Sequence, residues 1–281
     1  MSNNPLLREI RVSPIARTSV IVGLIYVFIA ILGPYLAPYD PTAMTTLPRQ
    51  APSVEHWFGT DEIGRDIFSR LLVGTRTALI VGFIAVGIGL SIGGVIGIVA
   101  AYFGGWLEML LMRFVDILLA FPGLLLALAV ITFLGPGLTN TMIAIGIGGI
   151  PGYARLIRGE VLSLLELDYV SAARGLGARD GRIIVRHLLP MAISPMLVYS
   201  TAQLARAVLA EAGLSYLGLG VQPPDPSWGG MIASGQRYIF DAPYMAIFPG
   251  LAIIVLVFAL NLLGDSLRDA LNPLLRAGRG Q

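Results

Sequence analysis

The sequence contains no cysteine and no lysine, and its only two histidines are His56 and His187. Without cysteine the chain cannot form disulfides, thiolate metal sites or iron–sulfur clusters, nor use a cysteine nucleophile. Without lysine it cannot carry an ordinary P-loop, whose lysine reaches the phosphates of ATP, or perform Schiff-base chemistry. Two histidines far apart in the sequence also argue against a multi-histidine metal site.

Charge is scarce as well. Only 13% of the 281 residues are charged, whereas 56% are hydrophobic. A soluble domain has about 25% charged residues, so the composition excludes an ordinary soluble protein and predicts an all-α membrane protein with several spans. The net charge of +2 is too small to indicate nucleic-acid binding.

Six apolar runs are long enough to cross a membrane as helices of about 20 residues. They lie at about 18–36, 78–102, 114–134, 139–155, 191–212 and 244–263. The first run follows three arginines, as a signal sequence would. It is too long for a signal sequence and no A-x-A cleavage site follows, so we expect it to remain in the protein.

Two of these runs carry small residues four positions apart, which let another helix approach closely in a membrane. The second run has such a ridge at Ala85, Gly89, Gly93 and Gly97, and the fourth has one at Ala144, Gly148 and Gly152. The sequence therefore predicts close helix packing along both ridges.

The polar segment 38–76 contains a stretch that predicts an amphipathic surface helix. Thr60 can cap a helix that has one apolar face, made by Ile63, Ile67 and Leu71. Asp66 and Arg70 would then be a favourable pair one helical turn apart. Trp57 would anchor this helix at the membrane interface.

The arginines indicate which segments face the cytoplasm. With the N-terminus inside, thirteen arginines lie inside and five outside, and Arg206 lies within the fifth run. This satisfies the positive-inside rule, and both termini and the segment 156–190 are then cytoplasmic. The loops 38–76 and 213–243 face out. The loop 213–243 contains Trp228. It either acts as a gate or docking site for an external binding protein, or is an ordinary rigid connector.

The segment from Asp168 to Pro190 carries the most specific pattern. It resembles the EAA motif of ABC importer permeases, which reads E-A-A, three residues, Gly, nine residues and I-x-L-P. Five residues match with the right gaps: Ala172, Ala173, Gly177, Leu189 and Pro190. Ser171 stands where the motif has Glu, and His187 where it has Ile.

Three further stretches resemble the same family. They are the 59–66 stretch GTDEIGRD, the 214–229 stretch from LSYLGLG to SWG, and the 261–273 stretch that begins NLLGD. From about residue 15 to 274 the chain is similar to the second permease subunit of ABC importers of the dipeptide, oligopeptide and nickel branch.

This resemblance implies a type I importer permease core, with five membrane helices after an extra N-terminal helix. Residues 1–76 would form the N-terminal tail, the extra helix and the external loop, and residues 77–281 the core. The ATPase-coupling residues would be Ser171, Ala172, Ala173, Arg174, Gly175, Gly177, Arg179, Leu189 and Pro190. A small face at Ala172–Ala173 can enter a groove, glycines allow the tight turn that follows, and arginines can pair with acidic groups.

The resemblance also implies the partners. A homologous permease would complete a heterodimer in the bacterial cytoplasmic (inner) membrane, with two ABC ATPase subunits inside and a solute-binding protein outside. ATP and magnesium would bind to the ATPases, so this chain would carry no cofactor and no catalytic residue. Peptides, glutathione, opines and nickel chelates are the solutes handled by similar permeases.

Four polar residues lie within or near the apolar runs: Gln203, Arg206, Glu211 and Asn261. Ionisable residues inside a membrane are functional candidates by default. We therefore expect these residues on the substrate pathway. Arg206 could face that path, pair with Glu211, or pair with the sister subunit.

Two alternatives belong to other classes. A stand-alone channel or secondary carrier would make the segment 156–190 incidental. A membrane-embedded enzyme would need a nucleophile–base pair or a metal cluster, which the two histidines cannot supply because they lie on opposite sides of the membrane in this topology.

Overall fold

The computed structural model describes residues 13–44 and 47–271, and these form helices and loops with no β-strand. Some residues of the sequence analysis lie outside the described residues. They are four of the arginines counted as cytoplasmic, Arg8, Arg11, Arg276 and Arg279, and Pro273 of the 261–273 stretch. The helices are α2 (Pro14–Leu36), α3 (Ile67–Phe103), α4 (Gly105–Leu119), α5 (Gly123–Leu134), α6 (Leu138–Leu165), α7 (Asp168–Gly175), α8 (Asp180–Ile183), the π-helical turn η1 (Ile184–Leu188), α9 (Leu189–Tyr216), α10 (Trp228–Gln236) and α11 (Tyr244–Leu271). The all-α fold class is confirmed.

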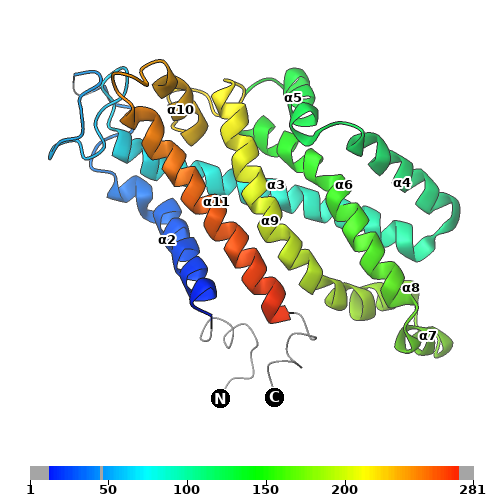
Figure 1. Cartoon of the computed structure of the whole chain (residues 1–281). Helices are drawn as coiled ribbons and strands as arrows, with labels where there is room; N and C mark the ends of the chain where they lie inside the picture. The colour runs from blue at the N-terminus through cyan, green and yellow to red at the C-terminus, as the bar shows by residue number, and fades with distance from the viewer. Residues whose placement is uncertain (1–12, 45–46, 272–281) are drawn as a thin grey trace.

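Long helices lie side by side and set the shape of the molecule (Figure 1). In that view α2, α11, α9 and α6 run in nearly the same direction, and α3 crosses behind them. The start of α2, the end of α11 and the short helix α7 lie towards the lower side, whereas α5 and α10 lie towards the upper side.

Four helical stretches are long and apolar enough to cross a membrane: α2, α3, the run Asp180–Tyr216 and α11. The bent pair α4–α5 makes a fifth if it counts as one span. The expected fourth span, 139–155, lies in α6, which does not meet the same test by composition. Its sequence is diluted by Gly and Thr residues and carries Arg155 and Arg158. Length and composition therefore support four or five of the six expected spans.

The expected third span, 114–134, is not one helix. It is broken into the end of α4 and α5, which meet at 91°. The break lies at Pro122, which has no N–H to donate and disfavours helical geometry at Phe121 before it. The chain turns there and restarts as α5 at Gly123.

Helices α3 and α6 form a close interface along the glycine ridge of α3. A Cβ on Gly97 would lie 2.6 Å from the carbonyl oxygen of Ala154, and one on Gly93 would meet that of Ile150. The ridge predicted on α3 is thus packed as expected. The ridge predicted on α6 faces other helices: a Cβ on Gly148 would lie 3.7 Å from the carbonyl oxygen of Gly123 in α5, and one on Gly152 would meet the Tyr199 hydroxyl of α9.

The amphipathic helix expected at 60–71 does not form. Residues before Ile67 make a hydrogen-bonded loop, and Asp66 caps α3 by accepting from the backbone N–H of Ser69 at 2.7 Å. Thr60 instead donates to the carbonyl oxygen of Leu47. A capping carboxylate at Asp66 satisfies a free amide at the helix start, so α3 begins there.

The segment 213–243 contains α10, and its Trp228 is buried, with 1% exposed. The indole Nε1 donates to the carbonyl oxygen of Leu71 at 3.1 Å, which ties α10 to α3. Gly74 leaves room for the ring, since a Cβ there would lie 2.9 Å from Trp228 Cδ1. Trp228 is a structural anchor and offers no surface to a partner.

Candidate functional site

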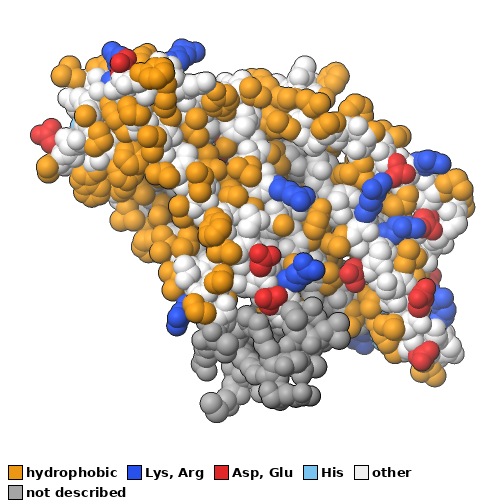
Figure 2. Space-filling view, in the orientation of Figure 1, with side chains coloured by type: hydrophobic (Ala, Val, Ile, Leu, Met, Phe, Trp, Pro, Cys, Tyr) orange, Lys and Arg blue, Asp and Glu red, His pale blue; other side chains and the backbone are white. Residues whose placement is uncertain are grey.

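The helix α7 projects from the end of the molecule and keeps one side chain buried. Val170 is 1% exposed and packs in an apolar cluster with Ile157 and Val161 of α6 and with Ile183 and Leu188. Figure 2 shows charged side chains gathered around α4 and this end, while hydrophobic side chains cover much of the rest of the visible face.

Most of the proposed ATPase-coupling residues are exposed to solvent, in contrast to the buried Val170. The exposed ones are Ser171, Ala172, Arg174, Gly175, Gly177, Arg179 and Pro190, whereas Ala173 and Leu189 are half-buried. Leu176, which the sequence reasoning passed over, is 90% exposed and adds an apolar knob beside the small face. A helix with an exposed small face and one buried anchor can dock into a partner without unfolding.

The turn after α7 depends on one glycine. Gly177 has φ +79°, a conformation that favours glycine. The φ of Gly175 is not in that region, and no atom within 4 Å would meet a Cβ there. The tight turn expected from both glycines therefore rests on Gly177.

Two tyrosines tie α7 and the turn to the long helices. The hydroxyl of Tyr102, at the end of α3, donates to Asp180 Oδ1 at 2.7 Å. The guanidinium of Arg174 lies 5.7 Å from the centre of the same tyrosine ring. Tyr169 donates to the carbonyl oxygen of His187 at 3.5 Å, a weaker contact. Movement of α7 is thus linked to α3 through Tyr102.

A groove of about 520 Å³ lies between the α4–α5 break, α6 and α9. Gln203 and Arg206 line it together with Tyr199. Gln203 donates to the Tyr199 hydroxyl at 3.0 Å, and Arg206 donates to Gln203 Oε1 at 3.3 Å. These side chains give an otherwise apolar groove three adjacent polar groups.

The other two pathway candidates do not line this groove. Glu211 is 1% exposed and accepts from the Ser215 hydroxyl at 2.7 Å. Glu211 lies five positions after Arg206, which places the two side chains on different faces of α9. The expected alternative of an Arg206–Glu211 pair is therefore not formed. Asn261 of α11 is exposed and donates to the carbonyl oxygen of Val257.

Sequence reasoning missed the aromatic part of the groove. Phe121 lies at the helix break and Tyr153 on α6, where its hydroxyl donates to Ser200 Oγ at 2.9 Å. The signal was present in Tyr199, which lies one turn before Gln203 on the same helix.

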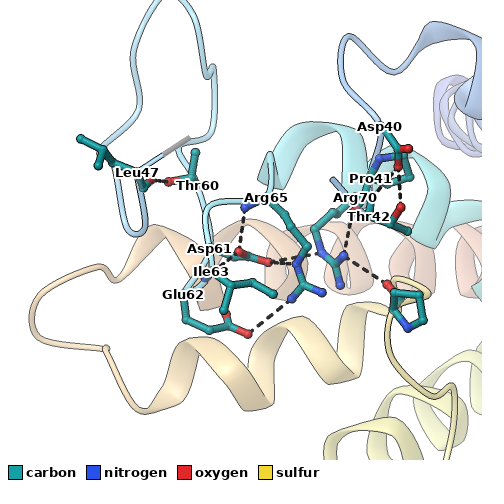
Figure 3. Close-up of polar contacts among 11 residues, drawn as sticks. Asp40, Pro41, Thr42, Leu47, Thr60, Asp61, Glu62, Ile63, Arg65 and Arg70 are labelled. Atoms are coloured by element: carbon teal, nitrogen blue, oxygen red, sulfur yellow. Dashed lines mark hydrogen bonds and ion pairs between the residues drawn. The ribbon is translucent and has the colours of Figure 1, made fainter. Parts of the chain in front are cut away.

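A buried polar cluster holds the loop that precedes α3 (Figure 3). Arg65 donates to Asp61 Oδ2 at 2.6 Å, and Arg70 donates to the carbonyl oxygens of Pro41 at 2.7 Å and Pro224 at 3.3 Å. The expected Asp66–Arg70 pair is wrong, because Asp66 contacts His56 and caps α3. Arg65 pairs within its own loop, whereas Arg70 reaches the separate segments that hold Pro41, Asp61 and Pro224 and ties them together.

Two further observations concern the chemistry of charged groups. Near the cluster, hydrogen bonds from the Thr42 side chain and backbone lower the pKa of the exposed Asp40 carboxyl. Among residues 13–44 and 47–271, no group of three or more His, Cys, Asp or Glu side chains could hold a metal ion.

Family models match most of the chain. Residues 93–277 match the binding-protein-dependent transport system inner membrane component. Residues 6–52 match the N-terminal membrane domain of oligopeptide transport permease C. The first match covers most of the part expected to be the core, and the second covers the N-terminal helix α2.

Curated relatives are similar over nearly their whole length. The glutathione transport system permease protein GsiD of Pectobacterium atrosepticum is 45% identical over 90% of this chain and 85% of that protein. The dipeptide transport system permease protein DppC of Alkalihalophilus pseudofirmus is 44% identical over 92% of this chain and 86% of that protein.

A solved structure shares the fold. A chain of the MetNI methionine ABC transporter, in an inward-facing conformation, matches with a TM-score of 0.60 and 21% identity, over 72% of this chain and 97% of that chain. Because the family model and the curated relatives are transport permeases, the stand-alone channel or carrier and the membrane enzyme are not retained. The chain belongs to the binding-protein-dependent transport system inner membrane component family, and it is a membrane permease subunit of an ABC importer.

Proposed function

We propose that this permease imports small peptides, with dipeptides and glutathione as the first solutes to test, and that α7 receives the force of ATP hydrolysis. The relatives named for glutathione and dipeptide transport support the solute class. The observation that carries the coupling role is the exposed motif face of α7 on its single buried anchor, Val170.

The coupling role follows from how α7 is attached. Its outward face is free for an ATPase subunit, and it is joined to α6 through Val170 and to α3 through the contact of Arg174 with the Tyr102 ring. A push on α7 is then passed to two long helices as rigid-body motion, which is how helical permeases change access. Arg179 and Arg182 lie exposed next to α7 and supply positive charge for an acidic groove rim.

The assembly has four kinds of subunit in this proposal. A homologous permease faces the groove that holds Gln203 and Arg206, and completes the path as a heterodimer. Two ATPase subunits bind ATP and magnesium and dock on α7, and a solute-binding protein docks on the opposite side. The chain itself binds no nucleotide.

The proposed sidedness places α7 and both termini in the cytoplasm of a bacterium. The start of α2, the end of α11 and α7 lie towards one side of the molecule (Figure 1), which supports this arrangement. Loops 38–66 and 217–243 then face out.

The coupling proposal is tested with Arg179→Cys in native membranes, since the chain has no other cysteine. A short photo-crosslinker on this cysteine should capture a P-loop ATPase, identified by mass spectrometry. Arg237→Cys, an exposed arginine in the outer loop, is the matched control and should capture none. A transport-competent Arg179→Cys protein that captures no ATPase would exclude α7 as the docking helix.

The solute proposal is tested by uptake of labelled dipeptide and labelled glutathione into cells with and without the chain. Chain-dependent uptake of at least one of them is expected. If neither enters, while the ATPase crosslink still forms, the solute class is wrong and the coupling role stands.

A further inference from the structure

Arg76 is an exposed cation in the membrane-spanning helix α3. Within the described part of the chain, its guanidinium has no hydrogen bond or ion pair with another residue. A charged group at a membrane helix surface is costly unless something pairs with it or it reaches the headgroup layer. Arg76 therefore needs a partner beyond the described residues, or contact with the headgroup layer.

The depth of Arg76 can be estimated from the length of α3. The helix has 37 residues, about 55 Å, whereas the hydrocarbon core is about 30 Å thick. No charged residue lies between Arg76 and Glu108. Arg76 thus marks one end of the uncharged run, at the level where lipid phosphates lie.

A groove of about 460 Å³ begins at Arg76 and runs between α2 and α3. Tyr35, 85% exposed and one residue from the end of α2, lies at the same end. An aromatic side chain at this position is typical of the membrane interface. Further along, the groove is lined by apolar side chains, among them Val27, Ile31, Ile80 and Phe83.

The groove therefore combines a cation at the interface with an apolar channel directed into the membrane. Ile31 is 64% exposed and Phe83 56% exposed, so no other part of the described chain covers it. A phospholipid has the complementary arrangement, with a negative phosphate at the interface and an acyl chain below it.

We propose that this groove binds one anionic phospholipid, with its phosphate on Arg76 and an acyl chain between α2 and α3. The lipid would neutralise Arg76 and fill the space between the extra N-terminal helix and the core. This role is separate from the coupling and solute roles proposed above, because the groove lies between α2 and the first half of α3 and Tyr102 lies near the end of α3.

The test uses the complete transporter complex in vesicles of phosphatidylethanolamine and phosphatidylglycerol. The probe is a phosphatidylglycerol that carries a photoactivatable group midway along one acyl chain. Labelled peptides, identified by mass spectrometry, should concentrate at residues 27–35 and 79–84. Arg76→Gln should reduce this labelling about fivefold, whereas Arg76→Lys, which keeps the charge, should retain most of it.

Controls separate a specific site from general lipid contact. Arg113→Gln, an exposed arginine on α4, should leave the groove labelling unchanged. The proposal is overturned if Arg76→Gln labels like the parent, if labelling spreads equally over exposed positions of α11, or if a phosphatidylethanolamine probe labels the groove as well as phosphatidylglycerol does. A crosslink from Ile80→Cys to the sister permease would also overturn it, because a protein would then cover the groove.

Discussion

At the scale of single residues, two glycines on the same helix show how position decides the effect of one methyl group. Gly97 of α3 lies against the backbone of α6, where a Cβ would be 2.6 Å from the carbonyl oxygen of Ala154 and 3.0 Å from the backbone nitrogen of Arg158. Gly87, on the same helix, has no atom within 4 Å of a Cβ. Backbone atoms cannot move aside as a flexible side chain can, so the two sites should respond oppositely.

We expect Gly97→Ala to destabilise the protein by about 1–3 kcal/mol through overpacking. Gly87→Ala should be neutral or stabilising, because alanine favours helix by about 1 kcal/mol over glycine. Thermal unfolding of the two detergent-purified variants measures the difference. Equal melting temperatures would contradict the packing account.

The groove residue Arg206 gives a second test at this scale. Its guanidinium contacts Gln203 and otherwise faces the groove, so it can meet a carboxylate of a peptide solute. Arg206→Ala should lower uptake about tenfold at normal complex abundance, since a hydrogen bond to a charged group contributes about 1.5–3 kcal/mol. Arg113→Ala, outside the groove, is the matched control. Unchanged uptake would remove Arg206 from the pathway.

At the scale of elements, the sequence predicted where helices exist better than where they begin, break or face. Uninterrupted apolar runs indicated α2, α3 and α11 directly. Pro122 predicts a helix break from the sequence alone. The 91° angle between α4 and α5 depends on packing against α6 and α9. The start of α3 was misplaced because Asp66 and Thr60 are both good helix caps, and the choice between them depends on contacts with distant loop residues.

For the candidate site, too, the sequence predicts which segment matters better than which way its side chains face. The motif spacing located α7, and the structure shows which of its residues face out. Gln203 and Arg206 were found because polar residues in an apolar run are conspicuous. The placement of Glu211 and Asn261 away from the groove depends on helix rotation, which local sequence does not determine.

The attachment of α3 to α8, directly after α7 and its turn, leads to a prediction at this scale. Tyr102→Phe removes the hydroxyl that donates to Asp180 at 2.7 Å. Uptake per ATP hydrolysed should fall about fivefold, matching a net hydrogen bond of about 1 kcal/mol, while ATPase docking is kept. Tyr169→Phe, whose contact is 3.5 Å, should have a smaller effect. Parallel measurement of ATP hydrolysis and uptake separates loss of coupling from loss of assembly, and equal effects of the two variants would contradict the role of Tyr102.

At the scale of the whole molecule, the N-terminal helix α2 contacts α3 and α11 directly, and not only through the loop that connects it to them. Tyr26 of α2 donates to the carbonyl oxygen of Ala252 in α11 at 2.9 Å, and Gly33 packs against the backbone of Leu72 in α3. Residues 51–55, in the connecting loop, are exposed. The Thr60 backbone N–H donates to the carbonyl oxygen of Gln50 at 3.0 Å, and the Gln50 N–H donates to the Thr60 hydroxyl at 2.8 Å, so the two sides of this exposed tip are tied together.

We therefore expect a permease expressed as two pieces, residues 1–52 and 53–281, to assemble and support uptake close to that of the intact chain, because exposed loop tips tolerate cleavage. Gly33→Leu in the first piece should prevent assembly, since a Cβ there already lies 2.9 Å from the carbonyl oxygen of Leu72. Co-purification and uptake measure the two outcomes. Failure of the unmodified pieces to assemble would show that α2 depends on its covalent link.

The burial of Trp228 has an optical consequence. The chain has three tryptophans, and the other two, Trp57 and Trp106, are 58% and 74% exposed. With both replaced by phenylalanine, the remaining indole fluoresces from a dry site between α10 and α3, bonded to the carbonyl oxygen of Leu71. Any step of the transport cycle that separates these helices admits water to the ring and shifts its emission to the red. The protein thus carries a native fluorophore that can time the separation of α10 from α3 without an attached dye.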